Sequence, residues 1–347
     1  MGCNLRDLAS PVPIQMTDLA GQRIAVDAFL TAYQFITSLR ARGEGKDGTY
    51  LRDSQGRPVS HLMGFLDRSA ALVEAGIDPV FVFDGRPHEL KFDTLAERKE
   101  RRVNAKEKWE AAIEAEDWKA ADKLGAQVVS YTPEMVQETQ RMLDLLGISW
   151  VEAPMEAEGA GAVRCANGEV AAVASQDWDT LLYGSPVMIR NLTSHGRKKF
   201  GRVLTAEKVV LKEMLDTHEI TKEQLVDLAI MIGTDFHPGI KGIGPKTGLK
   251  LIKEHGTMEA VAEVKEFEMP EDIETIRGLF LNHPVHPDPI PQAQRAVEKD
   301  LREFLQGEYG FSDGRLQRAL DRLASANHLK SENQPTLFER YDLFYSL

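Results

Sequence analysis

Four carboxylates lie close together in the sequence with the spacing of a metal site: Glu156, Glu158, Asp177 and Asp179. The glutamates follow Pro154 at the expected start of a helix, and the aspartates follow residues 170–174, an apolar run typical of a buried strand. Residues two apart on a regular helix point about 200° away from each other, so the glutamates converge only if the first turn is irregular or one acts through water. Either pair alone also has a purely structural interpretation. Acidic residues at a helix start stabilise the helix dipole, and acidic residues after a strand are common in turns.

Three further acidic residues end apolar segments: Asp27, Asp84 and Asp235. The first two end predicted β-strands, and the carboxyl ends of parallel strands share one edge of a sheet, so we expect the acids to meet there. Carboxylates about 4 Å apart repel by roughly 1 kcal/mol in water and about 4 kcal/mol at an intermediate dielectric, which favours bound cations. Oxygen ligands suit Mg²⁺ or Mn²⁺, and the sequence has no Cys/His set typical of zinc. Two such ions about 3.5–4 Å apart would activate water and clamp a phosphate.

The elements around these acids alternate as in an α/β protein. Helices are predicted over 27–42 and 60–76, and strands over 23–26, 80–83 and 148–151. This order predicts a mostly parallel central sheet flanked by helices.

A basic segment follows Asp84 directly, with eight cations between Arg86 and Lys108. Such a segment is often a solvated helix face whose glutamates pair with the cations. Beside a carboxylate cluster, it would also attract a phosphodiester that the acids alone repel. Lys91 and Arg98 are our candidates for that contact.

A glycine-rich turn between two predicted helices, 225–232 and one starting at Pro245, is typical of a phosphate-binding hairpin. Glycines allow a tight turn, and free amides at the second helix start can hold a phosphate. The sequence therefore predicts a helix-hairpin-helix that binds a phosphate backbone without reading base sequence. The residues assigned to this contact are Lys241, Gly242, Gly244 and Lys246.

Bulk properties leave the partner open. The 347 residues carry a formal net charge of −12, which by itself argues against nucleic acid, but the seven clustered acids account for −7 and two divalent ions would add +4. The two cysteines form no metal or disulfide pattern, as expected in a reducing compartment. No signal or transmembrane run is found, so we expect a cytoplasmic protein without membrane contact.

The C-terminal third offers weaker signals. Segment 282–291 is rich in proline, and its His283 and His286 are interpreted as part of a turn rather than as a metal pair. Helices are predicted over 292–305 and 315–324. Apolar residues near the chain end predict a docking peptide, with a helix folded back onto the core as the alternative.

Several motifs together resemble those of the flap endonucleases, which are XPG-type structure-specific 5′-nucleases. They are Val82-Phe83-Asp84-Gly85-Arg86-Pro87, Ser60-His61-Leu62-Met63-Gly64, Glu156-Ala157-Glu158, Ser175-Gln176-Asp177-Trp178-Asp179, and Ile232-Gly233-Thr234-Asp235 through Gly242-Ile243-Gly244-Pro245-Lys246. The resemblance implies a PIN-like nuclease fold with a helical arch, and two-metal hydrolysis of DNA near the base of a 5′ flap in replication and repair, with 5′-3′ exonuclease activity. It also implies that the seven acids hold two Mg²⁺ ions, for which Mn²⁺ substitutes, and that Lys91 and Arg98 stabilise the scissile phosphate. Tyr33 matches the aromatic on which a base stacks.

The resemblance also sets the expected organisation: a single nuclease domain over 1–330 and a tail over 331–347. Within that domain we expect an N-terminal nuclease region (1–105), an arch (86–130), an internal nuclease region (135–235) and the helix-hairpin-helix (236–260). The tail resembles a sliding-clamp peptide through Gln334, Leu337 and Tyr341, although Arg340 stands at the first usual aromatic position. Near the glutamates, Met155 and Gly159 also depart from the family pattern. The lack of a basic extension is typical of archaeal members, and we expect a monomer that binds branched DNA.

Our hypothesis is a Mg²⁺-dependent flap endonuclease. One alternative is a phosphohydrolase of the haloacid dehalogenase type, because Asp177-Trp178-Asp179-Thr180 after a strand imitates its nucleophile motif. That alternative leaves Asp27, Asp235 and the hairpin unexplained. A second alternative is a non-catalytic DNA-binding clamp adaptor that uses only the hairpin and tail.

Overall fold

The computed structural model describes residues 3–199 and 201–330, so the predicted tail residues Gln334, Leu337 and Tyr341 lie outside the described residues. A seven-stranded sheet forms the centre, in the order β1-β9-β6-β5-β2-β3-β4. Its strands are β1 (Val12–Ile14), β2 (Arg23–Asp27), β3 (Asp78–Phe83), β4 (Trp150–Glu152), β5 (Ala172–Ala174), β6 (Val187–Arg190) and β9 (Ala206–Val210). Strands β4, β3, β2, β5 and β6 pair in parallel, and β9 pairs antiparallel with both β6 and β1. The sheet is therefore mostly parallel, as predicted.

The central strands are buried on both faces, which explains their continuous apolar runs. In β2, Ile24 and Val26 join the core beneath helices α1, α2, α5 and α14, whereas Ala25 between them packs toward α6. Phe81 and Phe83 of β3 point to the first side in the same way. These helices are α1 (Ala28–Ser38), α2 (Ser60–Glu74), α5 (Pro133–Leu145), α6 (Ala157–Ala166) and α14 (Asp313–Ser325).

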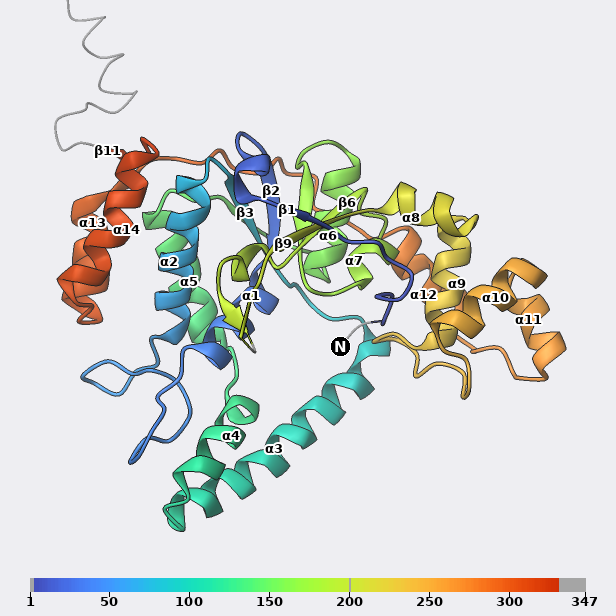
Figure 1. The fold of residues 1–347 in the computed structure, drawn as a ribbon, viewed down its shortest axis with the longest axis horizontal. Helices are drawn as coiled ribbons and strands as arrows, with labels where there is room; N and C mark the ends of the chain where they lie inside the picture. Colours follow the sequence, from blue (N-terminus) through green and yellow to red (C-terminus); the bar gives the residue numbers. More distant parts are fainter. Residues whose placement is uncertain (1–2, 200, 331–347) are drawn as a thin grey trace, which may run out of the picture.

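A second core joins the sheet to a group of helices at the opposite end of the molecule from α13 and α14 (Figure 1). Its members are α7 (Asp179–Leu182), α8 (Leu211–His218), α9 (Lys222–Ile232), α10 (Pro245–His255), α11 (Met258–Lys265) and α12 (Ile273–Leu281). Helices α9 and α10 form the predicted helix-hairpin-helix, and they approach closely because Gly248 leaves room for the side chain of Leu228.

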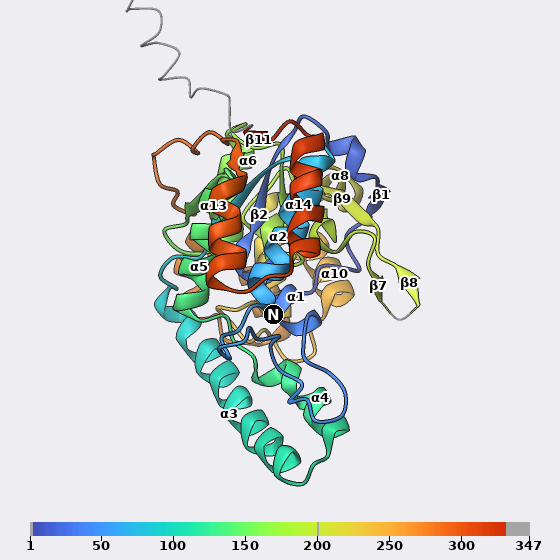
Figure 2. The ribbon, with the colours of Figure 1, turned by 90° about the vertical axis from the view of Figure 1, so that its left-hand side faces the viewer.

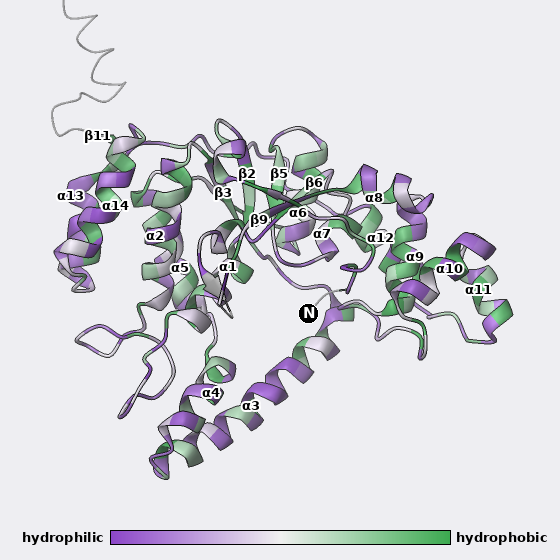
Figure 3. Ribbon diagram, in the orientation of Figure 1, coloured by the Kyte–Doolittle hydropathy of each residue, from purple (hydrophilic) through white to green (hydrophobic). Residues whose placement is uncertain are grey.

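Two helices project from the body as an arch: α3 (Phe92–Glu114) and α4 (Trp118–Val128) (Figures 1 and 2). In α3 the buried residues are Ala105 and Ala112, and Figure 3 shows the helix as largely hydrophilic. The arch is fixed to the body at Gly125, where an added Cβ would lie only 2.5 Å from the carbonyl carbon of Gly48. Arg40 reinforces this junction by donating hydrogen bonds of 2.6 Å to the carbonyls of both Gly48 and Asp122.

Two predicted helices differ in the structure because tertiary pairing overrides local periodicity. The helix predicted over 27–42 ends at Ser38, since the chain then turns to pair Arg40 with Tyr50. The helix predicted over 292–305 begins only at Glu298, because Ala296 and Val297 form β10, which pairs with β11 (Leu329–Lys330). Helix α13 (Glu298–Arg302) then continues as a π-helix over Glu303–Glu308.

The remaining small elements lie outside the central sheet. Strands β7 (Lys198–Lys199) and β8 (Arg202–Val203) form a hairpin that projects from one side (Figure 2). Short 3-10 turns cover Met16–Leu19, Glu89–Lys91 and Leu192–Ser194. Within the described part of the chain, we find no helix with the length and apolar character needed to cross a bilayer.

Candidate metal centre at the carboxyl edge of the sheet

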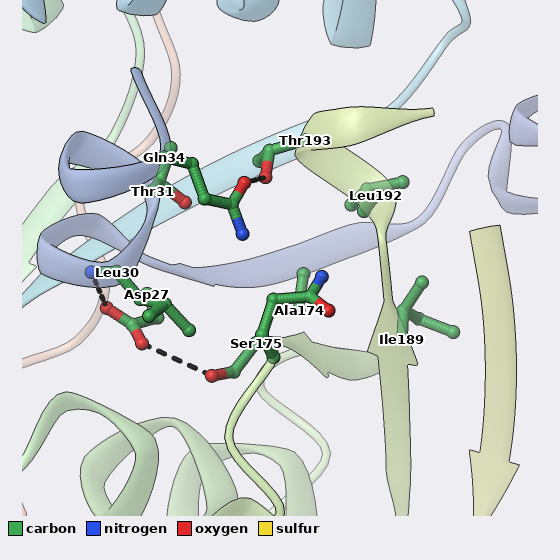
Figure 4. Close-up of a pocket in the computed structure, with 10 residues that line it drawn as sticks. Asp27, Leu30, Thr31, Gln34, Ala174, Ser175, Ile189, Leu192 and Thr193 are labelled. Carbon is green, nitrogen blue, oxygen red and sulfur yellow. Dashed lines mark hydrogen bonds between the residues drawn. The ribbon is translucent and has the colours of Figure 1, made fainter. Parts of the chain in front are cut away.

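Asp27 is the last residue of β2 and also caps the helix that follows it. Its carboxylate accepts hydrogen bonds from the amide of Leu30 at 2.8 Å and from the hydroxyl of Ser175 at 3.2 Å (Figure 4). The side chain borders a small polar hollow that Gln34 and Thr193 also line. These bonds fix one carboxylate at the edge of the sheet, and the role of Ser175 was not recognised from the sequence.

Asp84 follows β3, and Gly85 allows it to approach the next strand connection. An added Cβ at Gly85 would lie 2.7 Å from the carbonyl carbon of Pro154, so no side chain fits there. The Gly85 amide donates to the carbonyl of Met155 at 2.7 Å, and Asp84 accepts from the amide of Ala157 at 2.7 Å. The aspartate is thereby brought beside the start of α6.

Glu156 and Glu158 converge because the helix begins between them. Glu156 is the N-cap of α6, with an extended backbone at φ −79° and ψ 133°, so it does not follow helical geometry. One carboxylate oxygen from each of Asp84, Glu156 and Glu158 lies within 4.8 Å of the others. The irregular first turn that the sequence required is therefore present, and these three oxygens are spaced to share a cation.

Asp177 and Asp179 lie at the start of α7. The Asp179 amide donates to Asp177 at 3.2 Å, and the Asp179 carboxylate accepts from the amide of Cys3 at 2.7 Å. The N-terminal segment thus reaches into the site through Cys3. No pattern in the sequence predicts this contact, because it joins residues 176 positions apart.

Lys91 and Arg98, at the base of the arch, pair with the acids. Lys91 forms an ion pair with Glu156 and lies 3.5 Å from a carboxylate oxygen of Asp235. Arg98 donates to both oxygens of Asp235, at 2.7 and 2.8 Å. The hydroxyl of Thr94 also bonds the carbonyl of Asp235 at 2.9 Å, so this aspartate anchors the first turns of α3 to the end of α9.

Burial raises the pKa of four of these acids. Desolvation, opposed by the hydrogen bond from Leu30, raises the pKa of Asp27 to about 6. Desolvation and the charges of Asp27 and Glu156 raise the pKa of Asp84 to about 7. Burial also raises the pKa of Glu158 and Asp179 well above the usual range. Hard divalent cations fit this set of oxygen donors, because their positive charge would offset the repulsion and burial that raise these pKa values.

Asp235 behaves differently because both cations face it. Burial alone would raise its pKa, but Arg98 and Lys91 outweigh that effect and hold the pKa below its usual range. Burial alone would lower the pKa of Lys91, but attraction to Glu156 and Asp235 together outweighs burial and raises it. The seven carboxylates and two cations therefore form one electrostatic unit, although the function of each residue stays a prediction.

Tyr33 lies on α1, half-buried, at a hollow beneath the arch. Its hydroxyl accepts a hydrogen bond from Arg102 at 3.3 Å, and the hollow is also lined by Arg98, Arg101 and Val129. An aromatic ring beside three arginines suits a nucleic-acid base and its phosphates. Its role in base stacking stays a prediction.

The hairpin between α9 and α10 presents a polar surface. Gly242 has a φ of +89°, which L side chains rarely adopt, and Gly244 caps α10 ahead of Pro245. Lys241 and Lys246 are exposed. The first-turn amides of α10 have no acceptor within their own helix. This arrangement is suited to a phosphate, and the contact of these residues with DNA stays a prediction.

Comparisons with known proteins place this geometry in a wider context. A family model described as the XPG N-terminal domain matches residues 4–105, and one described as the XPG I-region matches residues 147–235. The Flap endonuclease 1 of Methanosarcina acetivorans is 40% identical over 332 residues, covering 94% of this chain and 97% of the relative.

Solved structures agree with the sequence matches. The flap endonuclease-1 from Methanococcus jannaschii superimposes with a TM-score of 0.73 at 34% identity, covering 94% of this chain and 98% of that one. The catalytic core of Rad2 in complex with DNA substrate gives a TM-score of 0.70 at 23% identity, covering 92% and 99% of the two chains, and at that identity it shows a likeness of fold alone. The predicted α/β nuclease fold is confirmed.

Proposed function

The chain belongs to the flap endonucleases of the XPG family, and we propose that it hydrolyses a DNA phosphodiester near the base of a 5′ flap with two Mg²⁺ ions. The observation that carries the proposal is the cluster of Asp84, Glu156 and Glu158 beside Lys91 and Arg98. The charges of Asp27, Asp177, Asp179 and Asp235 interact with this cluster or with one another. Exonuclease activity on recessed 5′ ends and a place in replication and repair belong to the same proposal.

The carboxylates divide naturally between two ions. Asp84, Glu156 and Glu158 would hold one, and Asp177 and Asp179 would hold the other, with Asp27 and Asp235 close to the two sets. Bound there, the ions would supply Lewis-acid polarisation of the phosphate and a nucleophile at neutral pH, and Mn²⁺ offers the same chemistry.

Lys91 and Arg98 would stabilise the phosphate. They now neutralise Glu156 and Asp235, and both could turn to a phosphate oxygen once those acids have another positive partner. Cations preorganised at the position where negative charge develops lower the barrier because they need little reorganisation.

The rest of the DNA would extend along two features. Tyr33 would stack a base near the cleaved bond, and Lys241, Gly242, Gly244 and Lys246 would hold the duplex backbone at the hairpin. The Rad2 catalytic core, similar in fold, was solved in complex with DNA substrate. A monomer working in the cytoplasm with a sliding clamp at its tail completes the proposal.

A branched duplex with a labelled 5′ flap tests the function. We expect Mg²⁺-dependent release of the flap, and Asp177→Ala should lower kcat by at least about 10²-fold. Glu263→Ala, an exposed carboxylate on α11, is the matched control and should cleave normally. Full activity in Asp177→Ala, or no release by the parent protein, would contradict the proposal.

The same experiment separates the two alternatives from this proposal. Hydrolysis of a simple phosphomonoester would favour the haloacid dehalogenase mechanism, and binding of branched DNA without cleavage in Mg²⁺ or Mn²⁺ would favour a clamp adaptor. The family comparisons favour the flap endonuclease over both.

A further inference from the structure

His283 is a buried imidazole that packs against Gly159 and Tyr183, two residues beside the candidate metal centre. It follows α12 at the beginning of the proline-rich segment, and only 6% of its surface is exposed. Neither ring nitrogen has a well-formed hydrogen bond within the described part of the chain. Burial lowers its pKa to about 4, against the opposing effect of the Pro284 backbone, and so favours the neutral ring at physiological pH.

The ring occupies a space that Gly159 leaves open. Gly159 lies on the first turn of α6, next to Glu158, and an added Cβ there would overlap the imidazole, with its Cγ only 2.5 Å away. A side chain of any size at position 159 would therefore displace His283. The glycine that departs from the family pattern thus has a physical use, because it admits this ring.

The His283 ring also contacts Tyr183, at the end of the helix that begins with Asp179. His283 packs edge-to-face on Tyr183, with ring centroids 4.9 Å apart, and Tyr183 directly follows α7, which starts with Asp179. Tyr183 in turn packs on Phe280 of α12, with ring centroids 5.1 Å apart. One side chain therefore touches both α6, with its glutamates, and the end of α7, with its aspartates.

We propose that His283 is a positioning residue whose bulk sets the separation between α6 and α7, and so between the two carboxylate sets that would bind metal. The imidazole acts by shape, since its nitrogens have no well-formed partner. Because protein interiors are tightly packed, a side chain buried between two helices sets the distance between them. This inference rests on the proposed two-ion function.

Paired variants test whether the bulk of His283 sets this separation. His283→Ala empties the space, Gly159→Ala overfills it, and the double variant Gly159→Ala/His283→Ala lets the new methyl group enter the emptied space. We expect each single variant to raise the Mg²⁺ concentration for half-maximal flap cleavage about tenfold. The double variant should return toward the parent value, because residues in contact are not additive.

A second measurement does not depend on cleavage. Mg²⁺ should raise the melting temperature of the parent protein, and the dependence of that rise on Mg²⁺ concentration should move in parallel with the cleavage values. If the parent binds Mg²⁺ but cleaves no flap, the proposed function fails. The Mg²⁺ dependence of the melting temperature then still tests the positioning role of His283. Gly314→Ala, at a helical glycine with open space around it, is the matched control and should change neither value.

A shape-conserving variant decides whether size or hydrogen bonding matters. His283→Leu should keep the parent Mg²⁺ dependence, because leucine has similar bulk. The proposal is overturned if His283→Leu fails as badly as His283→Ala while His283→Asn succeeds. It is equally overturned if the single variants lose thermal stability without any change in Mg²⁺ dependence, or if their effects simply add in the double variant.

Discussion

At the scale of single residues, Lys91 connects the acids to the expected phosphate. It is the cation closest to Glu156, and it also lies 3.5 Å from Asp235. We expect Lys91→Ala to lower kcat for flap cleavage by about 10²–10³-fold, because one preorganised charge at the reacting phosphate is lost. Binding of the flap DNA should change far less than kcat, since the hairpin and the residues beneath the arch would still hold the DNA.

Single-turnover cleavage together with a binding titration separates these two effects. Lys99→Ala removes an exposed lysine from α3, the helix that follows Lys91, and should retain near-normal kcat. If both variants slowed equally, Lys91 would be one member of a general basic surface and would have no special role at the phosphate.

The raised pKa of Asp84 gives a pH-dependent prediction for the metal-free protein. An acid whose folded-state pKa is about 7, against 3.8 unfolded, contributes stability below pH 4, and this contribution is lost as the pH rises toward 7. We therefore expect Asp84→Asn, which keeps an oxygen for the amide of Ala157, to stabilise the metal-free protein at pH 8 by about 2 kcal/mol, and much less at pH 4. Denaturant unfolding in EDTA at the two pH values measures the difference.

Added Mg²⁺ should make the parent protein more stable than Asp84→Asn at pH 8. It stabilises the parent by binding the folded form, whereas Asp84→Asn has lost a ligand and gains less. A variant equally stable or less stable than the parent at pH 8 without metal would contradict the raised pKa.

At the scale of elements, the arch is held by contacts at both of its ends. Asp235 bonds to Thr94 and Arg98 at the start of α3, and at the other end Gly125 of α4 lies against Gly48. We expect Gly125→Val to displace α4 and to increase amide hydrogen exchange across both arch helices. Flap cleavage should weaken mainly through KM, because Lys91 and Arg98 remain near the acids while the flap loses its guide.

Hydrogen exchange followed by mass spectrometry measures the effect by segment. Gly278→Ala is the control, because this α12 glycine has open space around it and should tolerate a methyl group. Unchanged exchange in residues 92–128 of Gly125→Val would show that other contacts hold the arch.

At the scale of the whole molecule, cleavage and clamp docking should be separable. The described residues 3–199 and 201–330 include all seven acids, both arch cations and the hairpin. We expect a chain ending at residue 330 to cleave a flap within about twofold of the parent rate, because no element of the proposed site is removed. It should no longer bind an archaeal sliding clamp, measured by surface plasmon resonance.

A full-length chain with both Leu337→Ala and Tyr341→Ala is the matched test of the peptide itself. It should lose clamp binding to the same extent as the shortened chain. Clamp binding that survives in both proteins would place the contact in the body instead of the tail.

Charge is also a property of the whole chain. The formal net charge is −12, and two bound divalent cations would leave −8, so binding of DNA depends on where the remaining cations lie. The lysines at the hairpin and the arginines beneath the arch supply such local positive surfaces. A negative overall charge is therefore compatible with DNA binding, as the carboxylate count indicated.

The sequence by itself determined the features that are local. Apolar runs ending at Asp27 and Asp84 specified parallel strands, and the rule that such strands share a carboxyl edge brought their acids to one place. The hairpin between α9 and α10 is also a local feature, and it followed from its glycines, Pro245 and the apolar periodicity of the flanking helices.

Only the tertiary structure decided how distant segments meet. Glu156 and Glu158 converge because packing against Asp84 and Gly85 starts α6 one residue after Glu156, and Cys3 reaches Asp179 across the chain. The space at Gly159 likewise has meaning only once His283 fills it. Periodicity reports which face of an element is buried, whereas these contacts depend on which other element covers that face, and a local pattern carries no record of its partner.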